Sequence, residues 1–348
     1  MSAMFDVVLC QNNERPEWDR YVAHASSATI CHDFVWHSVI NDVYGHRPFY
    51  LLARHDNEVA GVLPLFLVKS HLFGNSLTSM PFLDYGGICA ERDAVAEQLV
   101  RRAQNLMGEC GVDYIELRQY YPTTTDGAVR LDKVGMVLDL SPGSVALWRA
   151  LPAKVRNQVR KAEKSGLTAL VGSGELLDDF YPVFVQNMRD LGSPVHHKRF
   201  FAQIFTHFGD QVRLVVVRDG TKVVGGLVFL CFRDTVTVPW ASSLREYFAK
   251  CPNNLLYWEA LQYACTRGYS RFDFGRSSVG SGTYNFKKQW GAQAVQLYWQ
   301  LLSRDGTSKS VSFSAHREKY KIVLELWKRL PLPITQLVGP MIRKYLTN

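Results

Sequence analysis

The feature that most constrains the fold is an internal repeat of a strand–turn–strand pattern. Two segments align without a gap: LLARHDNEVAGVLPLF at 51–66 and VVVRDGTKVVGGLVFL at 215–230. Arg54 matches Arg218, and Gly61 matches Gly225. Each segment consists of an apolar run, a polar turn and a second apolar run, which predicts a β-hairpin. A chain that repeats a supersecondary unit is expected to contain two copies of the same domain.

The same elements follow each hairpin in the same order. A third strand, a helix and a further strand are predicted at 76–81, 94–107 and 114–117 in the first copy, and at 235–242, 255–264 and 271–274 in the second. Each helix ends at a glycine, Gly111 or Gly268. This order predicts an α/β (α+β) fold with two tandem domains, each a mixed, mostly antiparallel sheet flanked by helices.

A turn at Pro142-Gly143 separates the two copies. We therefore expect a first domain at 1–140, a second domain at 141–314 and a basic C-terminal region at 315–348. The C-terminal region reads as two short amphipathic helices, separated by the prolines of Leu330-Pro-Leu-Pro333.

Composition excludes several classes of protein. The chain has 348 residues, a net charge of +8 and no apolar run near the roughly 20 residues that a membrane-spanning helix needs. Its seven cysteines are scattered without a C-x-x-C pair, and no H-E-x-x-H motif is present, so we expect free thiols and no metal site. Aromatic and basic residues do not alternate as nucleic-acid stacking surfaces require. With no secretory signal at the N-terminus, the expected location is the cytoplasm.

Three motifs resemble those of one protein family. They are Val155-Arg-Asn-Gln-Val-Arg-Lys-Ala-Glu-Lys-Ser-Gly166, Phe272-Asp-Phe-Gly-Arg-Ser277 followed by Tyr284-Asn-Phe-Lys-Lys-Gln-Trp-Gly291, and Pro81-Phe-Leu-Asp-Tyr-Gly-Gly87. Together they resemble the FemAB-like (FemABX or BioF2-like) proteins of the GNAT superfamily. The third motif is similar to the subgroup associated with exosortase and exopolysaccharide systems. The resemblance covers about residues 30–345.

The resemblance implies an acyltransferase that forms an amide on a peptidoglycan, other cell-envelope or exopolysaccharide precursor. It implies a nucleotide- or lipid-linked sugar or peptide as acceptor, and aminoacyl-tRNA or an acyl-carrier thioester as donor. An activated ester needs no covalent enzyme intermediate, and we expect no tightly bound cofactor. The acetyl-CoA pattern R/Q-x-x-G-x-G/A is missing from 242–252, although another carrier such as acyl-CoA stays open. The alternative is a non-catalytic accessory protein of an envelope or polysaccharide assembly system.

The glycine-rich stretch from Gly275 to Lys287 is the predicted centre of the site. It follows the last repeated strand, where α/β sheets expose their ligand-binding edge, and glycines allow backbone N–H groups to approach a ligand. We predict Lys287 and Arg276 as catalytic residues that face developing negative charge, and Lys288 as solvent-facing. The predicted substrate contacts in this stretch are Ser277, Ser278, Gly280, Gly282 and Tyr284. The alternative is a glycine loop with a solvated arginine.

Three further groups are candidate substrate contacts, each with a structural alternative. Arg156 and Arg160 form a basic stripe that would clamp phosphate or tRNA, or would be a solvated helix face. Asp84 and Tyr85 would line a cleft or form a turn. Trp240 would be a cleft aromatic or a core residue.

The C-terminal region sets apolar residues beside lysine and arginine. Such segments bind anionic membranes peripherally by burying an apolar face. This predicts contact with the inner face of a membrane, and the alternative is packing on the second domain.

Overall fold

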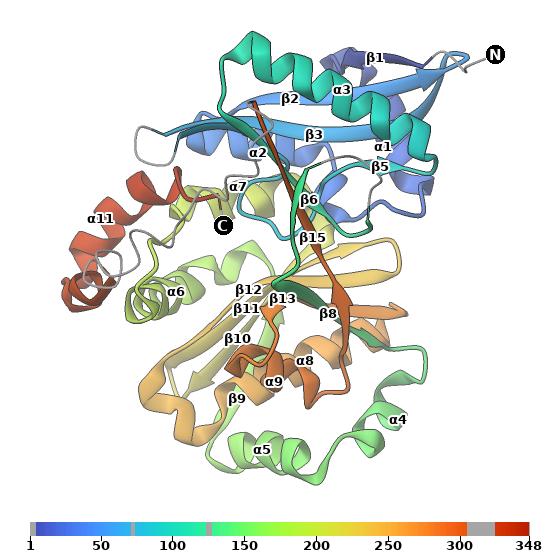
Figure 1. Cartoon of the computed structure of the whole chain (residues 1–348). Coiled ribbons are helices and arrows are strands. Elements are labelled where there is room, and N and C mark those ends of the chain that lie inside the picture. The colour runs from blue at the N-terminus through green and yellow to red at the C-terminus, as the bar shows by residue number, and fades with distance from the viewer. Residues whose placement is uncertain (1–4, 71–73, 123–126, 305–323, 348) are drawn as a thin grey trace. The chain divides into compact units, whose positions relative to one another are not determined.

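The computed structural model describes residues 5–70, 74–122, 127–304 and 324–347, and its chain forms two compact units (Figure 1). The described residues of the first unit lie within 5–133, 296–304 and 344–347. Those of the second lie within 134–295 and 324–343. No helix among the described residues is long and apolar enough to cross a membrane.

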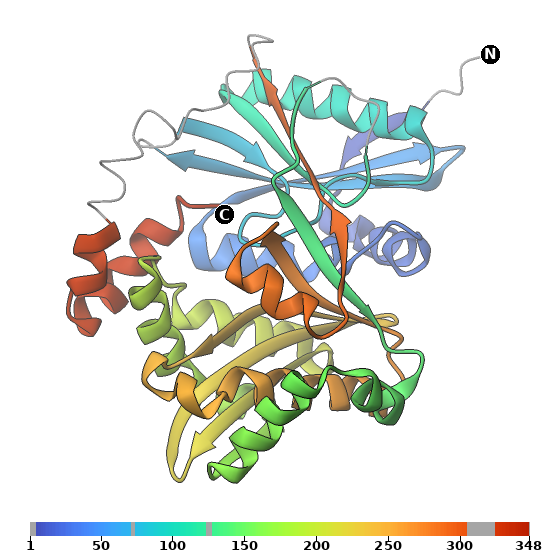
Figure 2. The ribbon, with the colours of Figure 1, turned by 60° about the horizontal axis from the view of Figure 1, so that its bottom comes forward.

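The first unit contains a sheet in the order β1-β2-β3-β4-β6-β15-β7, with β5 paired to β3. Its strands are β1 (Asp6–Leu9), β2 (Arg47–His55), β3 (Glu58–Ser70), β4 (Gly74–Thr78), β5 (Cys89–Ala90), β6 (Tyr114–Gln119), β7 (Ala128–Arg130) and β15 (Tyr298–Ser303). Its helices are η1 (Asn12–Glu14), α1 (Arg15–His24), η2 (Ile30–His32), α2 (Val35–Tyr44) and α3 (Asp93–Cys110). Helix α3 lies across the sheet and packs its apolar side on β2, β3 and β6 (Figure 2).

The second unit contains a sheet in the order β14-β8-β13-β12-β11-β10-β9. Its strands are β8 (Lys133–Asp139), β9 (Leu167–Gly172), β10 (Val212–Asp219), β11 (Lys222–Phe232), β12 (Thr235–Ser243), β13 (Arg271–Ser278) and β14 (Gln293–Gln296). Its helices are α4 (Gly143–Ala150), α5 (Ala153–Lys164), η3 (Gly174–Leu176), α6 (Leu177–Leu191), α7 (Lys198–Phe208), η4 (Gly209–Gln211), η5 (Arg245–Lys250), α8 (Pro252–Thr266), α9 (Gly282–Lys288) and α11 (Leu332–Arg343).

The predicted repeat is confirmed in topology. In each unit two antiparallel hairpin strands are followed by a third antiparallel strand, a helix and a strand that returns parallel to the third. These elements are β2-β3-β4-α3-β6 and β10-β11-β12-α8-β13. Both hairpins carry a register shift at the matched position, between Ala53 and Arg54 and between Val217 and Arg218. The matched arginine is therefore part of the repeated hairpin geometry.

The repeat extends further toward the N-terminus than the sequence match indicated. Strand β1 pairs with β2, and β9 pairs with β10. Both β1 and β9 are followed in the chain by a 3₁₀ turn and two α-helices. Arg54 forms ion pairs with Glu17 of α1 and with Glu14, and Arg218 forms one with Asp179 of α6. The same link between hairpin and preceding helix thus occurs in both units.

The matched glycines Gly61 and Gly225 explain how each helix packs on its sheet. A Cβ atom at Gly61 would lie 2.7 Å from Cγ1 of Val95 in α3, and one at Gly225 would lie 3.0 Å from Cδ1 of Leu256 in α8. Contacts this short leave no room for a methyl group. Glycine therefore allows the same close helix–strand approach in each copy.

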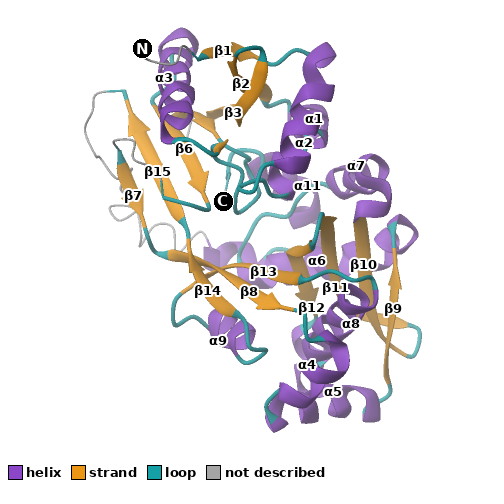
Figure 3. Ribbon diagram, turned by 90° about the vertical axis from the view of Figure 1, so that its right-hand side faces the viewer, coloured by secondary structure: helices purple, strands orange, loops and turns teal. Residues whose placement is uncertain are grey.

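The two halves of the chain exchange one strand (Figure 3). β8 follows β7 in the chain but pairs into the second sheet, and β15 follows β14 but pairs with β6 in the first. The sequence placed the domain boundary near residue 140 and assigned residues up to 314 to the second domain. The compact units instead divide at Lys133/Val134, and β15 belongs to the first unit because its backbone completes the ladder on β6.

Candidate active site in the second unit

The candidate site begins where β13 leaves its neighbour β12. Their parallel pairing joins Thr235–Thr237 with Arg271–Asp273 and, among the described residues, extends no further. Asp273 is buried, and its Oδ1 atom accepts a hydrogen bond of 2.8 Å from the N–H of Gly275. Gly275 has a φ of +75°, a left-handed conformation that favours glycine. The Asp273 side chain thus accepts the N–H of Gly275 at the point where β13 separates from β12.

Lys287 holds this turn in place from helix α9. Ser281 caps the helix by accepting a hydrogen bond of 3.1 Å from the N–H of Tyr284. One turn further along, the Nζ atom of Lys287 donates to the carbonyl oxygens of Gly275, at 3.0 Å, and of Arg276, at 2.8 Å. The Lys287 side chain is only 8% exposed. Its ammonium group therefore fixes two successive carbonyls of β13, ahead of the link to α9.

The remaining predicted loop residues are brought together between β13 and α9. Ser277 is 4% exposed, and no described residue forms a hydrogen bond with its Oγ atom. Gly280 has a φ of +77°, and the carbonyl of Ser278 accepts a hydrogen bond from Ser281 N–H at 3.1 Å. Gly282 begins α9 with nothing within 4 Å of a Cβ placed on it. The loop thus places a buried hydroxyl next to the half-buried Arg276.

In the first unit, the corresponding strand edge is filled by the chain itself. Ser79 N–H donates to the carbonyl of Glu116 at 2.8 Å, and Gly87 N–H donates to that of Arg118 at 2.9 Å. The buried guanidinium of Arg118 donates to the carbonyl of Leu83 at 2.6 Å. The segment 79–87 therefore occupies the edge of β6 beyond its pairing with β4.

The candidate residues Asp84 and Tyr85 lie in this filling segment. Tyr85 is buried, and its ring meets that of Tyr120 edge-on with 5.1 Å between centroids. Both residues belong to the first unit, whereas residues 275–288 belong to the second.

Arg156, Arg160 and Trp240 have structural contacts. Nη1 of Arg156 donates to the carbonyls of Arg149 and Leu151, which lie at the C-terminal end of α4 where helix carbonyls need donors. The guanidinium of Arg160 lies over the ring of Trp148, 5.5 Å from its centroid. Trp240 is buried in an aromatic cluster with the residues His196, Phe200 and Phe201.

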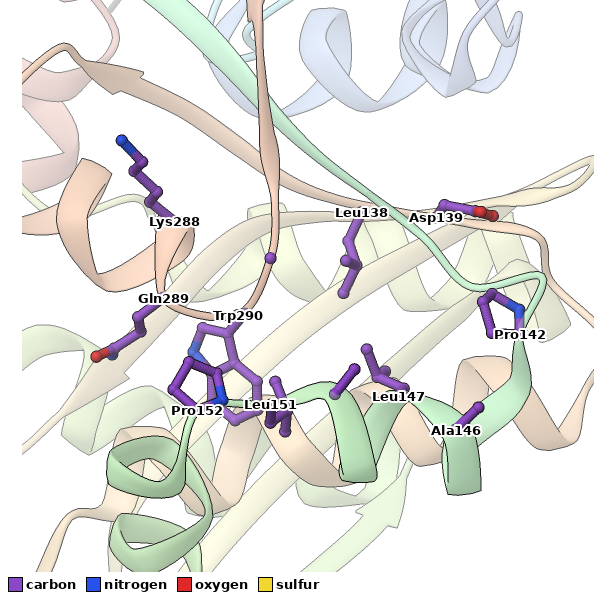
Figure 4. A pocket seen from close by; sticks show the side chains of 12 residues that line it. Leu138, Asp139, Pro142, Ala146, Leu147, Leu151, Pro152, Lys288, Gln289 and Trp290 are labelled. Carbon is purple, nitrogen blue, oxygen red and sulfur yellow. The ribbon is translucent and has the colours of Figure 1, made fainter.

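A pocket of about 500 Å³ adjoins the end of α9 (Figure 4). Its walls are the end of β8, helix α4, the link from α4 to α5 and residues 288–291. Lys288 is at its border, and the indole nitrogen of the buried Trp290 has no hydrogen-bond partner among the described residues. The sequence predicted that Lys288 faces solvent, and Lys288 is exposed at the border of this pocket, whereas Lys287 is buried against the backbone.

Four of the seven cysteines have thiol pKa values above the usual range. Burial raises the pKa of the Cys10 thiol to about 12, and it raises the pKa values of Cys110, Cys231 and Cys265 as well. A raised pKa disfavours the thiolate that acts as nucleophile. No group of three or more His, Cys, Asp or Glu residues with the arrangement of a metal site occurs among these residues.

Asp273 in the second copy aligns with Glu116 in the first. The two carboxylates have different contacts: Glu116 Oε1 pairs with Arg118 at 2.7 Å, whereas Asp273 accepts the N–H of Gly275. The sequence signal was the glycine two residues after Asp273, since the first copy has Arg118 at that position.

Comparison with known proteins agrees with this architecture. Residues 149–288 match the family model of an acetyltransferase (GNAT) domain, and no curated protein sequence gives a match. Among solved structures, FemX has a TM-score of 0.67 at 13% identity and covers 92% of this chain and 100% of its own. L-PGS from Bacillus licheniformis has a TM-score of 0.55 at 12% identity, with 98% of each chain covered. A tandem GNAT protein from the clavulanic acid biosynthesis pathway has a TM-score of 0.54 at 11% identity and covers 86% of this chain and 98% of its own.

These relatives confirm the predicted fold, and the matched domain contains β13, α9 and the link between them. Residues 149–288, in the second unit, thus match an acetyltransferase domain of the GNAT superfamily, a class of domain that transfers acyl groups, and the chain shares its overall fold with FemX.

Proposed function

We propose that the second unit transfers an acyl or aminoacyl group to an amine on a nucleotide- or lipid-linked sugar or peptide precursor of the cell envelope or of an exopolysaccharide. The observation that carries this proposal is the contrast between the two strand edges. The edge of β6 is filled by residues 79–87, whereas β13 turns away from β12 after Asp273. An extended donor that contains amide groups can bind along such a backbone edge.

The reaction joins the acceptor nitrogen to the acyl carbon. A neutral amine attacks the carbonyl of an activated ester or thioester, the C–N bond forms, and the bond to the carrier oxygen or sulfur breaks. The amine loses one proton, and the departing carrier atom takes one up. Negative charge develops on the carbonyl oxygen between these events, and preorganised donors that stabilise it are worth roughly 3 kcal/mol each.

The loop residues supply groups for these tasks. The Ser277 hydroxyl and the Arg276 guanidinium are our candidates for contact with the donor carbonyl. The Lys287 ammonium already donates to two loop carbonyls, so we assign it as a positioning residue that acts through the loop. The donor is aminoacyl-tRNA or a carrier thioester, and a lipid-linked acceptor would place the reaction at the inner face of a membrane.

A transfer assay on the full chain tests this function. The protein would be incubated with acyl-CoA, acyl-carrier-protein thioester or aminoacyl-tRNA together with a nucleotide-linked amino sugar or peptide, and amide products would be identified by mass spectrometry. We expect product with one donor class, lowered at least tenfold in Ser277→Ala. Native mass spectrometry of ligands retained through purification would narrow the donor and acceptor classes.

Binding without turnover would favour the accessory protein instead. If a donor or acceptor binds stoichiometrically but no amide forms with any donor class, the transfer proposal is wrong. Equal turnover by Ser277→Ala and the unchanged protein would leave transfer standing and remove Ser277 from it.

A further inference from the structure

Helix α11 turns small residues toward the rest of the second unit. It packs on α6 (Figures 1 and 2), and its buried positions are Thr335, Gly339 and Pro340. A Cβ atom at Gly339 would lie 2.8 Å from Cγ1 and 3.0 Å from the backbone nitrogen of Val195. The helix therefore approaches the protein through a surface that has little apolar side-chain volume.

Its large apolar side chains point away from the protein. Ile334 is 45% exposed, Leu337 is 74% exposed and Met341 is 65% exposed. Their spacing of three and four residues places them on one face of the helix. A helix of a globular protein normally buries such residues and exposes polar ones. Contiguous exposed apolar residues mark an interaction surface.

The charge around this face is mostly positive. From Leu324 to Asn348 the sequence contains one acidic residue, Glu325, which pairs with Lys328 at 2.6 Å, and four cations: Lys328, Arg329, Arg343 and Lys344. Arg329 is exposed, and Leu326, on the helical residues that precede α11, is 60% exposed. Cationic side chains beside an apolar strip are complementary to a lipid bilayer, because its anionic headgroups cover an apolar layer.

The Arg343 side chain anchors the other end of the helix. Its Nε atom donates to Nε2 of the buried His196 at 3.1 Å. This bond requires the His196 nitrogen to be unprotonated, and it joins the end of α11 to the segment that α11 packs against. The orientation of the outward face is thus fixed by a specific contact.

We propose that the outward face of α11, formed by Ile334, Leu337 and Met341, docks the protein on an anionic lipid bilayer. The helix of 12 residues lies in the plane of the surface, since it is too short to span the roughly 30 Å apolar layer. The apolar side chains enter the headgroup boundary, and Arg329 contacts lipid phosphate. This docking is independent of the identity of the acyl donor.

A vesicle flotation assay on the full chain tests the proposal. The vesicles would contain phosphatidylglycerol with phosphatidylcholine, or phosphatidylcholine alone, without donor or acceptor, so that failure here is distinct from failure of the transfer function. We expect binding to the anionic vesicles that weakens with salt. Leu337→Glu and Met341→Glu should each lower the partition coefficient at least tenfold, because each places a charge in the apolar layer.

Leu170→Glu is the matched control, because Leu170 is 49% exposed on β9 and lies outside the docking face. It should bind as the unchanged protein does. Arg329→Gln should weaken binding to anionic vesicles only, by several-fold.

Three results would overturn the proposal. One is equal vesicle binding by Leu337→Glu and the unchanged protein. The second is a dimer in light scattering that Leu337→Glu dissociates, which would make a second copy the occupant. The third is an absence of vesicle binding together with a lower unfolding temperature in both Leu337→Glu and Met341→Glu. That result would indicate that a segment of the same chain covers the outward face of α11.

Discussion

The Nζ atom of Lys287 lies 3.0 Å from the carbonyl oxygen of Gly275, and this contact joins helix α9 to the turned end of strand β13. The same ammonium reaches the carbonyl of Arg276 at 2.8 Å. Two carbonyls of adjacent residues converge on one donor because Gly275 adopts a positive φ. The lysine thus sets the path of the loop that carries Ser277.

The first prediction separates the two adjacent lysines. Lys287→Ala removes the donor for two loop carbonyls and should lower kcat by about 10²-fold or more, on the scale of losing a preorganised group. Lys288→Ala removes a side chain at the pocket border and should have a mild effect. Steady-state kinetics of both variants check this, with circular dichroism to establish folding. Equal, small effects of both substitutions would exclude Lys287 from the mechanism.

The second prediction concerns close packing in the repeat. A methyl group at Gly225 would lie 2.8 Å from Oγ of Ser243 and 3.0 Å from Cδ1 of Leu256, so Gly225→Ala should destabilise the protein by about 1–3 kcal/mol. Gly108→Ala in α3 is the control, because nothing lies within 4 Å of its Cβ position. That change should stabilise by roughly 0.5–1 kcal/mol. Denaturant unfolding measures both, and destabilisation by both would contradict the packing argument.

The third prediction is a loss of stability in mild acid. Burial lowers the pKa of His32 and of His46 to about 4, and it lowers the pKa of His196 well below the usual value. Between about pH 6.5 and 4 the unfolded chain therefore binds more protons at these histidines than the folded one. Stability from this source is complete above pH 6.5 and falls as the pH falls below it.

His46→Gln tests this directly. Nε2 of His46 lies 2.7 Å from the carbonyl oxygen of Lys344, and glutamine retains an N–H donor without titrating. We expect a shallower decrease in unfolding free energy between pH 6.5 and 5, whatever the stability of the variant at pH 7. An unchanged slope would show that His46 does not contribute.

The fourth prediction follows from the exchanged strand. Residues 1–133 lack β15, which pairs with β6 from Tyr298↔Gln119 to Ser303↔Tyr114. Trp299 is buried in this strand, and the guanidinium carbon of Arg118 lies 4.6 Å from its ring centroid. Expressed alone, 1–133 should lack a cooperative thermal transition, because β6 is left as an open edge. Co-expression with 134–348 should restore it. A cooperative transition in the fragment alone would contradict this.

The sequence predicted the repeat because its signals are local. The hairpin match depends on Arg54, Gly61 and their partners, which perform the same task in both units. The preceding helices were not matched, because apolar residues replace one another freely on a packed helix face. The exchanged strand was missed because strand pairing is non-local, and no residue in 298–303 identifies the sheet that it joins.

The sequence singled out the residues of the candidate site but did not predict their contacts. The loop at 275–288 follows from its glycines and motif, whereas the choice between Lys287 and Lys288 depends on which side of a two-turn helix faces β13. Arg156 resembled a phosphate ligand in the sequence. Its guanidinium instead meets the carbonyls of Arg149 and Leu151, a contact that depends on where α4 ends.

The exchanged strand also sets an order of events during synthesis. The ribosome completes β6 at Gln119 but does not reach β15 until Tyr298, about 180 residues later. At roughly 5–20 residues per second, the first sheet waits about 10–35 seconds with β6 unpaired on one side. Over the same interval β8 is already present to complete the second sheet. The sheet whose strands are synthesised first is therefore completed last. The nascent chain needs protection of the open edge of β6 until β15 emerges from the ribosome.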